Sequence, residues 1–320
     1  MKFKLKGLTT QNETINLPNP IWFEFLINNF GANVLYRFFF LKPIPDKITL
    51  VKVYLNNEHS QIFMVDRVCE NIQNKKNRIS TFELVLSSPI NLIWQNYVQP
   101  ETFEQLSINT LFEKFCKPFS IKSILPDLLN SPPTNFITSL GMTCWDVVCL
   151  FFKKVFNVTV FVNQNKQITT KFIPEHAVQL NTNNPNLTMF KSIVDRTKLI
   201  STIMVQLPDD DSNTFLKLKQ NSNIISEQLK INRTKYFKLP KQFDMLPNKG
   251  AQAIVEKYAT NHKIMVLEFS KILAPLWPGS IVTLLDGSKK TDLCVSEFYC
   301  ALLKTGPVSK IKFYHSDLLT

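Results

Sequence analysis

PDKITLV, at residues 45–51, leads through a polar turn to IFMVD at residues 62–66. A similar order returns later in the chain, where PGSIVTL at residues 278–284 leads through a polar turn to LCVSE at residues 293–297. Both copies have the β-branched and apolar residues that are typical of two strands joined by a turn. The sequence therefore contains a strand-turn-strand unit that occurs twice.

The spacing within the two copies is similar. The first strand precedes the second by 14 residues from Ile48 to Ile62 and by 12 residues from Ile281 to Leu293, and a third strand begins 16 residues after the second in both copies. Chance similarity between two β-meanders would give comparable offsets, whereas a true repeat predicts two similar β domains.

The composition is that of a packed globular chain. With 320 residues, 44% of them hydrophobic and 19% charged, the chain is long and apolar enough to bury a core as two or three domains. Seven glycines against 18 prolines and 26 phenylalanines exclude collagen-like and glycine-rich phosphate-binding architectures and favour aromatic-rich sheets.

Working outward from the first copy of the unit, the N-terminal region reads as a compact β domain. Residues 34–40 are apolar on both faces, whereas a sheet with one exposed face would alternate with polar residues. One face can fill a barrel interior, so the other implies a neighbouring domain or subunit. The predicted strands are residues 22–27, 34–41, 48–55, 61–68 and 79–86.

The middle of the chain changes to helical periodicity. Amphipathic helices are predicted at residues 107–116 and 143–155, with capping boxes at 110–113 and 143–146. The segment GMTCWDVV at residues 141–148 also resembles the opening of a peptidoglycan-binding LysM repeat, but a capped apolar helix has the same residues. A loop is predicted at residues 123–136, and a hairpin at 158–173 with its turn at 163–166. The later part of the chain is predicted to form a helix at 251–260 and strands at 200–207, 263–269, 281–285, 293–303 and 308–315.

This order predicts an α+β, mostly β, chain with two similar β-barrel domains, a small α/β domain and a polar insertion between them. The expected domains are residues 1–92 for the first barrel, 93–187 for the α/β domain and 188–320 for the second barrel, with the insertion at about 209–248.

The charge of +12 comes from 37 basic and 25 acidic residues. Its basic runs are scattered over turns and strand ends, where they are solvated, while a nucleic-acid groove needs several cations that converge on one face. The charge alone therefore does not identify a partner.

No catalytic, cofactor-binding or metal-binding residues are predicted, and we expect no enzyme activity. The four histidines, at 59, 176, 262 and 315, are scattered, and the acidic triplet 209–211 lacks the spaced oxygen donors of a calcium loop. The sequence has no GxSxG, GxxxxGK[ST] or GxGxxG motif.

The chain has six cysteines among apolar neighbours and without metal-ligand spacing, at positions 69, 116, 144, 149, 294 and 300. This pattern predicts buried reduced thiols in a protein assembled in the cytoplasm. A disulfide between Cys294 and Cys300 is the alternative. The N-terminal segment lacks the apolar core of a signal peptide, and charged residues interrupt the most apolar window, 144–162. We expect no membrane anchor.

The order of the segments resembles a family of tail proteins. The stretches that carry the resemblance are the linker at 86–94, the helix and turn at 107–121 in which Ser120 replaces a usual glycine, the helix and hairpin at 141–161, the stretch 233–237 and the strand entry WPGSIV at 277–282. Together they resemble the baseplate hub proteins of contractile phage tails, a group that includes the Mu-like tail hub, the late control protein D family and the N-terminal part of type VI secretion spike proteins.

The resemblance implies a non-enzymatic homotrimer without cofactors, located in the tail baseplate of a virion or phage-like injection particle and assembled in the host cytoplasm. Its two barrels per chain would make a pseudo-sixfold ring that joins the hexameric tail tube protein to the trimeric tail spike protein and contacts other baseplate proteins. DNA would only pass through the bore, so we expect the net positive charge on the outer surface.

Two other functions stay open on the sequence alone. A basic nucleic-acid-binding protein would need clustered cations and exposed aromatic residues, and a cell-wall-binding tail protein would need a sugar-binding groove or an acid/base pair. The sequence assigns no binding residues to any of the three functions.

Overall fold

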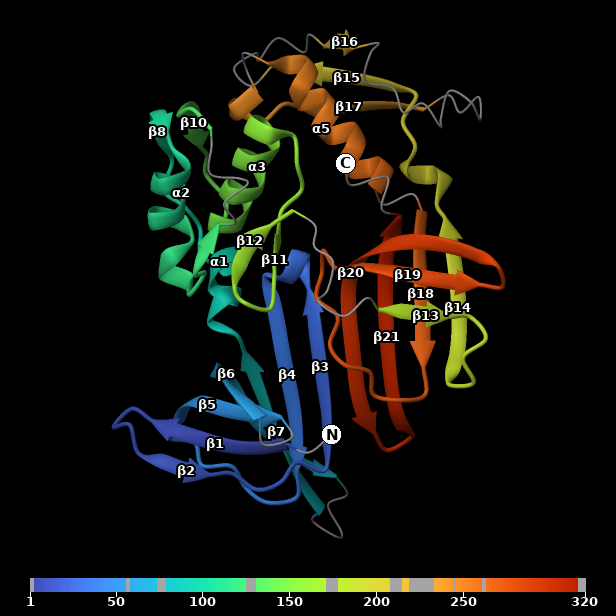
Figure 1. Cartoon of the computed structure of the whole chain (residues 1–320). Coiled ribbons are helices and arrows are strands. Elements are labelled where there is room, and N and C mark those ends of the chain that lie inside the picture. Colours follow the sequence, from blue (N-terminus) through green and yellow to red (C-terminus); the bar gives the residue numbers. More distant parts are fainter. Residues whose placement is uncertain are drawn as a thin grey trace.

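The computed structural model in Figure 1 describes residues 3–55, 58–73, 79–124, 131–170, 178–207, 215–218, 233–243, 246–260 and 263–315. It confirms a mostly β chain, whose largest element is one continuous sheet. The eight long strands of this sheet, in spatial order, are β6 (Glu58–Gln73), β7 (Ile79–Ser87), β4 (Asn33–Phe40), β3 (Trp22–Asn28), β20 (Lys289–Leu303), β21 (Gly306–His315), β18 (Lys263–Phe269) and β14 (Leu187–Val194), and all neighbours are antiparallel.

In each half of the sheet, a second layer of strands lies across the long strands (Figure 1). The strands β5 (Ile48–Leu55), β1 (Phe3–Thr9) and β2 (Thr14–Asn16) continue from β6, while β19 (Ile281–Asp286) and β13 (Gln179–Asn181) continue from β20. The ring of Phe3 in β1 lies 4.6 Å from that of Phe23 and 5.1 Å from that of Phe38, so β1 folds back over β3 and β4. Closure of either half into a full barrel stays a prediction.

The strand pairings contain the repeat found in the sequence. The order β3-β4-β7-β6-β5 in the first half matches β14-β18-β21-β20-β19 in the second. Both copies have a β-bulge at the same place, between Val65 and Arg67 in β6 and between Val295 and Glu297 in β20. A bulge at a fixed position is a specific feature of a strand pair, so its recurrence supports a duplicated unit.

The alignment of the two copies from the sequence was wrong by two residues in the first strand, where Leu50 and not Ile48 is the counterpart of Ile281, and by one residue in the second strand. The pairings place Phe63, and not Ile62, opposite Leu293 in the comparison, because Val51 pairs with Phe63 as Val282 pairs with Leu293. Phe63 is 1% exposed and Ile62 is 43% exposed. Two successive apolar residues give no alternation from which the buried one can be identified.

Two small domains interrupt the sheet and lie at the same end of it (Figure 1). The first follows β7 and contains η2 (Pro89–Asn91), α1 (Leu92–Gln95), β8 (Glu101–Leu106), α2 (Ile108–Phe115), η3 (Lys117–Phe119), β9 (Ser123–Ile124), β10 (Thr134–Thr138), α3 (Cys144–Phe156), β11 (Phe161–Val162) and β12 (Gln167–Thr169). The second follows β14 and contains η5 (Arg196–Lys198), β15 (Thr202–Gln206), β16 (Leu216–Leu218), β17 (Thr234–Lys238), η7 (Lys241–Phe243) and α5 (Pro247–Thr260).

The helix predictions are confirmed in position, with one error in capping. The Thr143 hydroxyl accepts the Asp146 N–H at 3.1 Å, and the Asp146 carboxylate accepts the Thr143 N–H at 2.9 Å, so α3 has the predicted capping box. The box predicted at 110–113 is wrong, because Ser107 caps α2 and accepts the Thr110 N–H at 3.1 Å. The loop predicted at 123–136 is also wrong at both ends, where β9 and β10 find partners in β12 and β8.

A close backbone contact fixes the first small domain to the long sheet. Gly31, in η1 (Asn29–Gly31) between β3 and β4, has φ +84°, and a Cβ added there would lie 2.1 Å from the Val162 carbonyl oxygen. The neighbouring ring of Phe30 lies 5.6 Å from that of Phe161. Only glycine combines this φ with such an approach, so the turn sets how the small domain sits on the sheet.

Candidate assembly interface

The junction of the two halves is an edge-to-edge strand pair between β20 and β3. On one face of the junction, Phe298 lies opposite Ile27 and Cys300 opposite Phe25. Phe298 and Ile27 have no exposed surface, and the rings of Phe25 and Phe298 are 6.3 Å apart. Burial raises the pKa of the Cys300 thiol to about 12, as expected for a side chain in this core. We call this the covered face, because the second layer lies over it.

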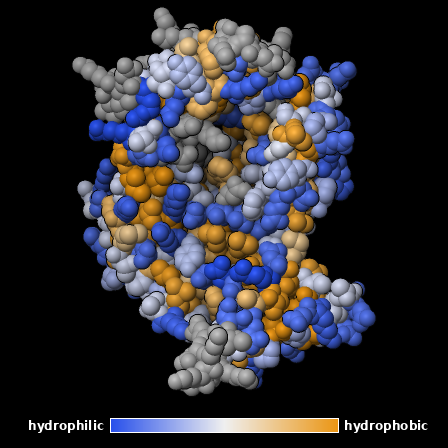
Figure 2. All heavy atoms as spheres, turned by 180° about the vertical axis from the view of Figure 1, so that it is seen from behind, coloured by the Kyte–Doolittle hydropathy of each residue, from blue (hydrophilic) through white to orange (hydrophobic). Residues whose placement is uncertain are grey.

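The opposite side of the long strands, the open face, carries charged and apolar residues and has no second layer of strands among the described residues. Strand β3 shows the alternation, since Phe23 and Phe25 are buried while Glu24 between them is half-buried on the open face. Figure 2 views the molecule from behind and shows hydrophilic and hydrophobic residues mixed. The charged residues that the strand registers place on the open face are Glu24, Asp66, Glu83, Glu268, Glu297, Arg37, Arg67, Lys191, Lys310 and Lys312.

Five of these ten residues are acidic and five are basic, so their charges sum to zero, whereas the net charge of the whole chain is +12. Opposite charges face each other across the strands, with Glu268 opposite Lys310 and Glu297 opposite Lys312. Acidic residues on the open face therefore neutralise the basic residues beside them.

Ion pairs hold the two arginines of the open face. The Arg37 guanidinium lies 3.0 Å from the Glu24 carboxylate and 3.2 Å from that of Glu83, which also lies 2.8 Å from Arg67. The Glu83 side chain is only 12% exposed, so it is the most desolvated member of this network. Burial and the nearby Glu24 carboxylate raise the pKa of Tyr299, whose phenol stays neutral on this face.

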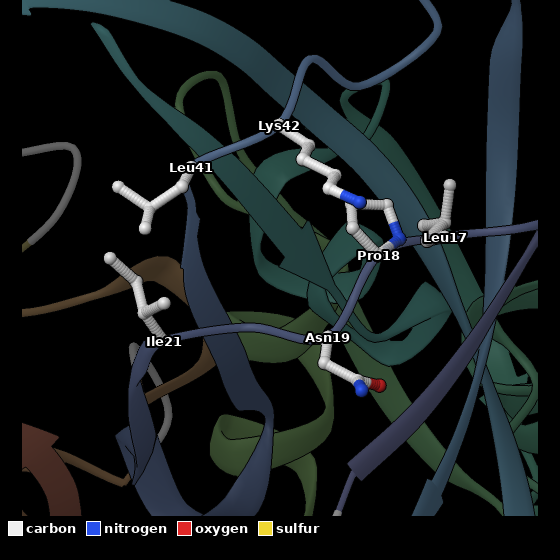
Figure 3. Close-up of a pocket in the computed structure, with 6 residues that line it drawn as sticks. All are labelled: Leu17, Pro18, Asn19, Ile21, Leu41 and Lys42. Carbon is white, nitrogen blue, oxygen red and sulfur yellow. The ribbon is translucent and has the colours of Figure 1, made fainter. Parts of the chain in front are cut away.

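Two shallow depressions lie on the surface, and neither has the residues of an active site. The one in Figure 3, of about 460 Å³, lies at the end of the sheet away from the small domains and is lined by Leu17, Pro18, Asn19, Ile21, Leu41 and Lys42. The other, of about 380 Å³, lies on the open face beside Arg37 and Arg67, whose guanidinium groups are already paired. Neither lining contains a histidine or a cysteine.

The described part of the chain contains no group of acidic, histidine and cysteine residues that could hold a metal ion. None of its helices is long and apolar enough to cross a bilayer. His176, His262 and the triplet 209–211 lie outside the described residues. Four cysteines are buried as predicted, at positions 116, 144, 294 and 300, whereas Cys69 on β6 and Cys149 on α3 are partly exposed.

Two strand edges of the long sheet have no partner within the described residues. The outer edge of β14 is one end of the sheet. The other edge belongs to β6 after its bulge, because β5 pairs with β6 only between Glu58 and Met64. On β14, Phe190 is 45% exposed and Val194 is 55% exposed, which is unusual for apolar residues of a central sheet. The sequence did not predict these edges as interface residues.

Comparisons with known proteins agree on the fold. The sequence matches no known protein family and no curated protein. The structure is similar over its whole length to a 43 kDa tail protein of prophage MuSo2 from Shewanella oneidensis, with a TM-score of 0.72, 12% identity and coverage of 100% of both chains. It is also similar to a tail protein from Neisseria meningitidis, with a TM-score of 0.73, 9% identity and coverage of 100% of this chain and 98% of that one.

A third similar structure comes from Escherichia coli and is described as a component of the type VI secretion system with structural similarity to T4 bacteriophage tail proteins. Its TM-score is 0.60 at 8% identity, with coverage of 99% of this chain and 78% of that one. The chain therefore has the fold that these tail proteins and this secretion component share, which confirms the resemblance found in its sequence.

Proposed function

We propose that this chain is the baseplate hub of a contractile phage tail or phage-like injection particle, in which three copies form a ring between the hexameric tail tube and the trimeric spike. The observation that carries the proposal is the duplicated five-strand unit, whose two copies are joined edge to edge through β3 and β20. Three copies of a chain with two alike units present six equivalent positions, which is what a threefold protein needs to match a sixfold one.

The two ends of the sheet suit two partners of different symmetry. The small domains, which differ from each other in their elements, both lie at one end (Figure 1). That end keeps only the threefold symmetry of the ring, and we assign it to the spike. The other end has neither small domain (Figure 1), and we assign it to the tube.

The size of the long sheet supports an open ring. Three copies with eight long strands each would contribute 24 strands, and a spacing of about 4.8 Å gives a circumference of roughly 115 Å and a diameter of about 37 Å. Second layers packed about 10 Å from the long strands would fill this ring if they faced inward. The open face therefore lines the bore.

The compensated charge of the open face suits passage of DNA. A bore with unpaired cations would retain DNA, because each neutralised phosphate adds to affinity. Since the ten charged residues of the open face sum to zero, the +12 of the chain is carried by other residues. The role is structural and non-enzymatic, and the partners are further copies of the chain, the tube, the spike and other baseplate proteins in a virion tail assembled in the host cytoplasm.

Electron microscopy of the purified full-length protein tests this function. End-on class averages are expected to show a ring of six lobes around an open centre, with threefold differences at one end. Compact particles without a central opening, or twofold averages, would overturn the proposal.

A further inference from the structure

We infer that the two unpaired edges join neighbouring copies of the chain, with β6 of one copy pairing antiparallel with β14 of the next in the register that puts Cys69 opposite Ile193. We call this contact the seam. The inference rests on the proposed ring and deepens it, because it names the residues that a second copy contacts.

The internal junction provides the template for the seam. Strand β20 pairs with β19 up to Cys294 and then, on the same side, with β3 from Phe298 to Leu302. Strand β6 pairs with β5 up to Met64, and the same side of its second half has no partner among the described residues. The open edge of β6 therefore corresponds to the edge of β20, which β3 of the first unit fills.

The strand registers align the residues of the two units one by one. The shared bulge aligns Val65 with Val295 and hence Cys69 with Tyr299. On the other side, Phe23 pairs with Phe38 as Phe190 pairs with Leu267, which aligns β3 with β14. Ile193 is thereby the counterpart of Leu26.

The register of the seam follows from these equivalences. Within the chain, Tyr299 lies opposite Leu26. Transferred to two copies, the expected pairs are Val68 with Val194, Cys69 with Ile193, Glu70 with Ser192, Asn71 with Lys191 and Ile72 with Phe190. No two like charges face each other in this register, and neither edge contains a proline.

Burial distinguishes the filled template from the unfilled edge. Phe23 is 3% exposed and its counterpart Phe190 is 45% exposed; Ile27 is fully buried and its counterpart Val194 is 55% exposed. Both exposed residues lie on the covered face, where β20 buries Phe23 and Ile27. A second copy of this chain supplies an edge of the matching length, direction and face, so it is the occupant that the fold specifies.

A single substitution tests the register, because Cys69 is native. Directly opposite residues in an antiparallel pair have Cα atoms about 4.5–5.5 Å apart, within the range of a disulfide. Ile193→Cys is therefore expected to give a covalent trimer on oxidation, seen on a non-reducing gel. Ser192→Cys is the matched control, because its side chain points to the other face, and we expect at least about tenfold less product from it.

Two further variants exclude other origins of a cross-link. The double variant Cys69→Ser with Ile193→Cys should give no covalent trimer. The double variant Leu26→Cys with Tyr299→Cys should instead form a disulfide inside one chain, at the internal position that corresponds to the seam. Preferential cross-linking of Ser192→Cys, or a trimer by mass that does not cross-link through Ile193→Cys, would overturn the seam register and leave the ring intact. A wild-type protein that forms a stable dimer would instead overturn the ring itself.

Discussion

Replacing Phe190 with alanine should weaken assembly while the chain itself stays folded. A phenylalanine buries about 150–250 Å² when it is fully enclosed, so the 45% that is exposed leaves about 90 Å² for a neighbouring copy to cover. At about 25 cal/mol per Å², this area is worth about 2 kcal/mol per seam and about 7 kcal/mol over three seams. The assembly constant should fall on the order of 10⁵-fold.

Because three chains combine, the concentration at half-assembly varies with the square root of this constant and should rise on the order of 300-fold. Sedimentation velocity over a dilution series measures it. Phe23→Ala, at the internal counterpart, should instead cost the single chain about 3–5 kcal/mol in urea unfolding, since Phe23 is 3% exposed. Leu140→Ala is the matched control, because Leu140 is 89% exposed and lies outside the long strands.

Assembly of Phe190→Ala at the same concentration as the wild type and Leu140→Ala would contradict the seam. Destabilisation of the single chain by Phe190→Ala as large as that by Phe23→Ala would contradict it too, because Phe190 would then be a core residue and not an interface residue.

Three further predictions follow from the network, the turn and the buried thiol. Glu83→Gln leaves Arg67 without its carboxylate and gives the open face one extra charge per chain, so a ring should bind DNA more tightly with a salt slope steeper by up to about 3 in fluorescence anisotropy; unchanged binding would contradict the role of charge compensation. Gly31→Ala should lower the free energy of unfolding by about 2 kcal/mol or more, because its Cβ would meet the Val162 carbonyl oxygen, and an unchanged urea midpoint would refute the close contact. Since burial raises the pKa of Cys300 to about 12, iodoacetamide at pH 8 should label Cys69 and spare Cys300 in the native protein, and rapid labelling of Cys300 by mass spectrometry would show that its pocket is open.

The sequence predicted elements whose signals are local. The capping residues Thr143 and Asp146 and the apolar stripe between 144 and 155 define α3 without any distant partner. Strand β1 also has a local signal, since Phe3 and Leu5 alternate with Lys4 and Lys6, although it is not among the predicted strands.

The sequence could not predict the contacts that form the candidate interface. Nothing near Phe298 indicates that Ile27, hundreds of positions away, is its partner, because strand pairing is decided by the whole fold. Phe190 and Phe23 are the same residue type in similar strands, and only the pairing of β3 with β20 separates the buried one from the exposed one. The repeat itself was visible, but its turns differ in length, which shifted the alignment.

The mass of the purified wild-type protein in solution, measured by light scattering over a concentration series at moderate salt, tests the ring most directly. A trimeric ring predicts a species of about 111 kDa, three times the 37.0 kDa of one chain, whose fraction grows with concentration. A stable dimer of about 74 kDa would contradict it, because two copies of a chain with two alike units cannot match a sixfold tube.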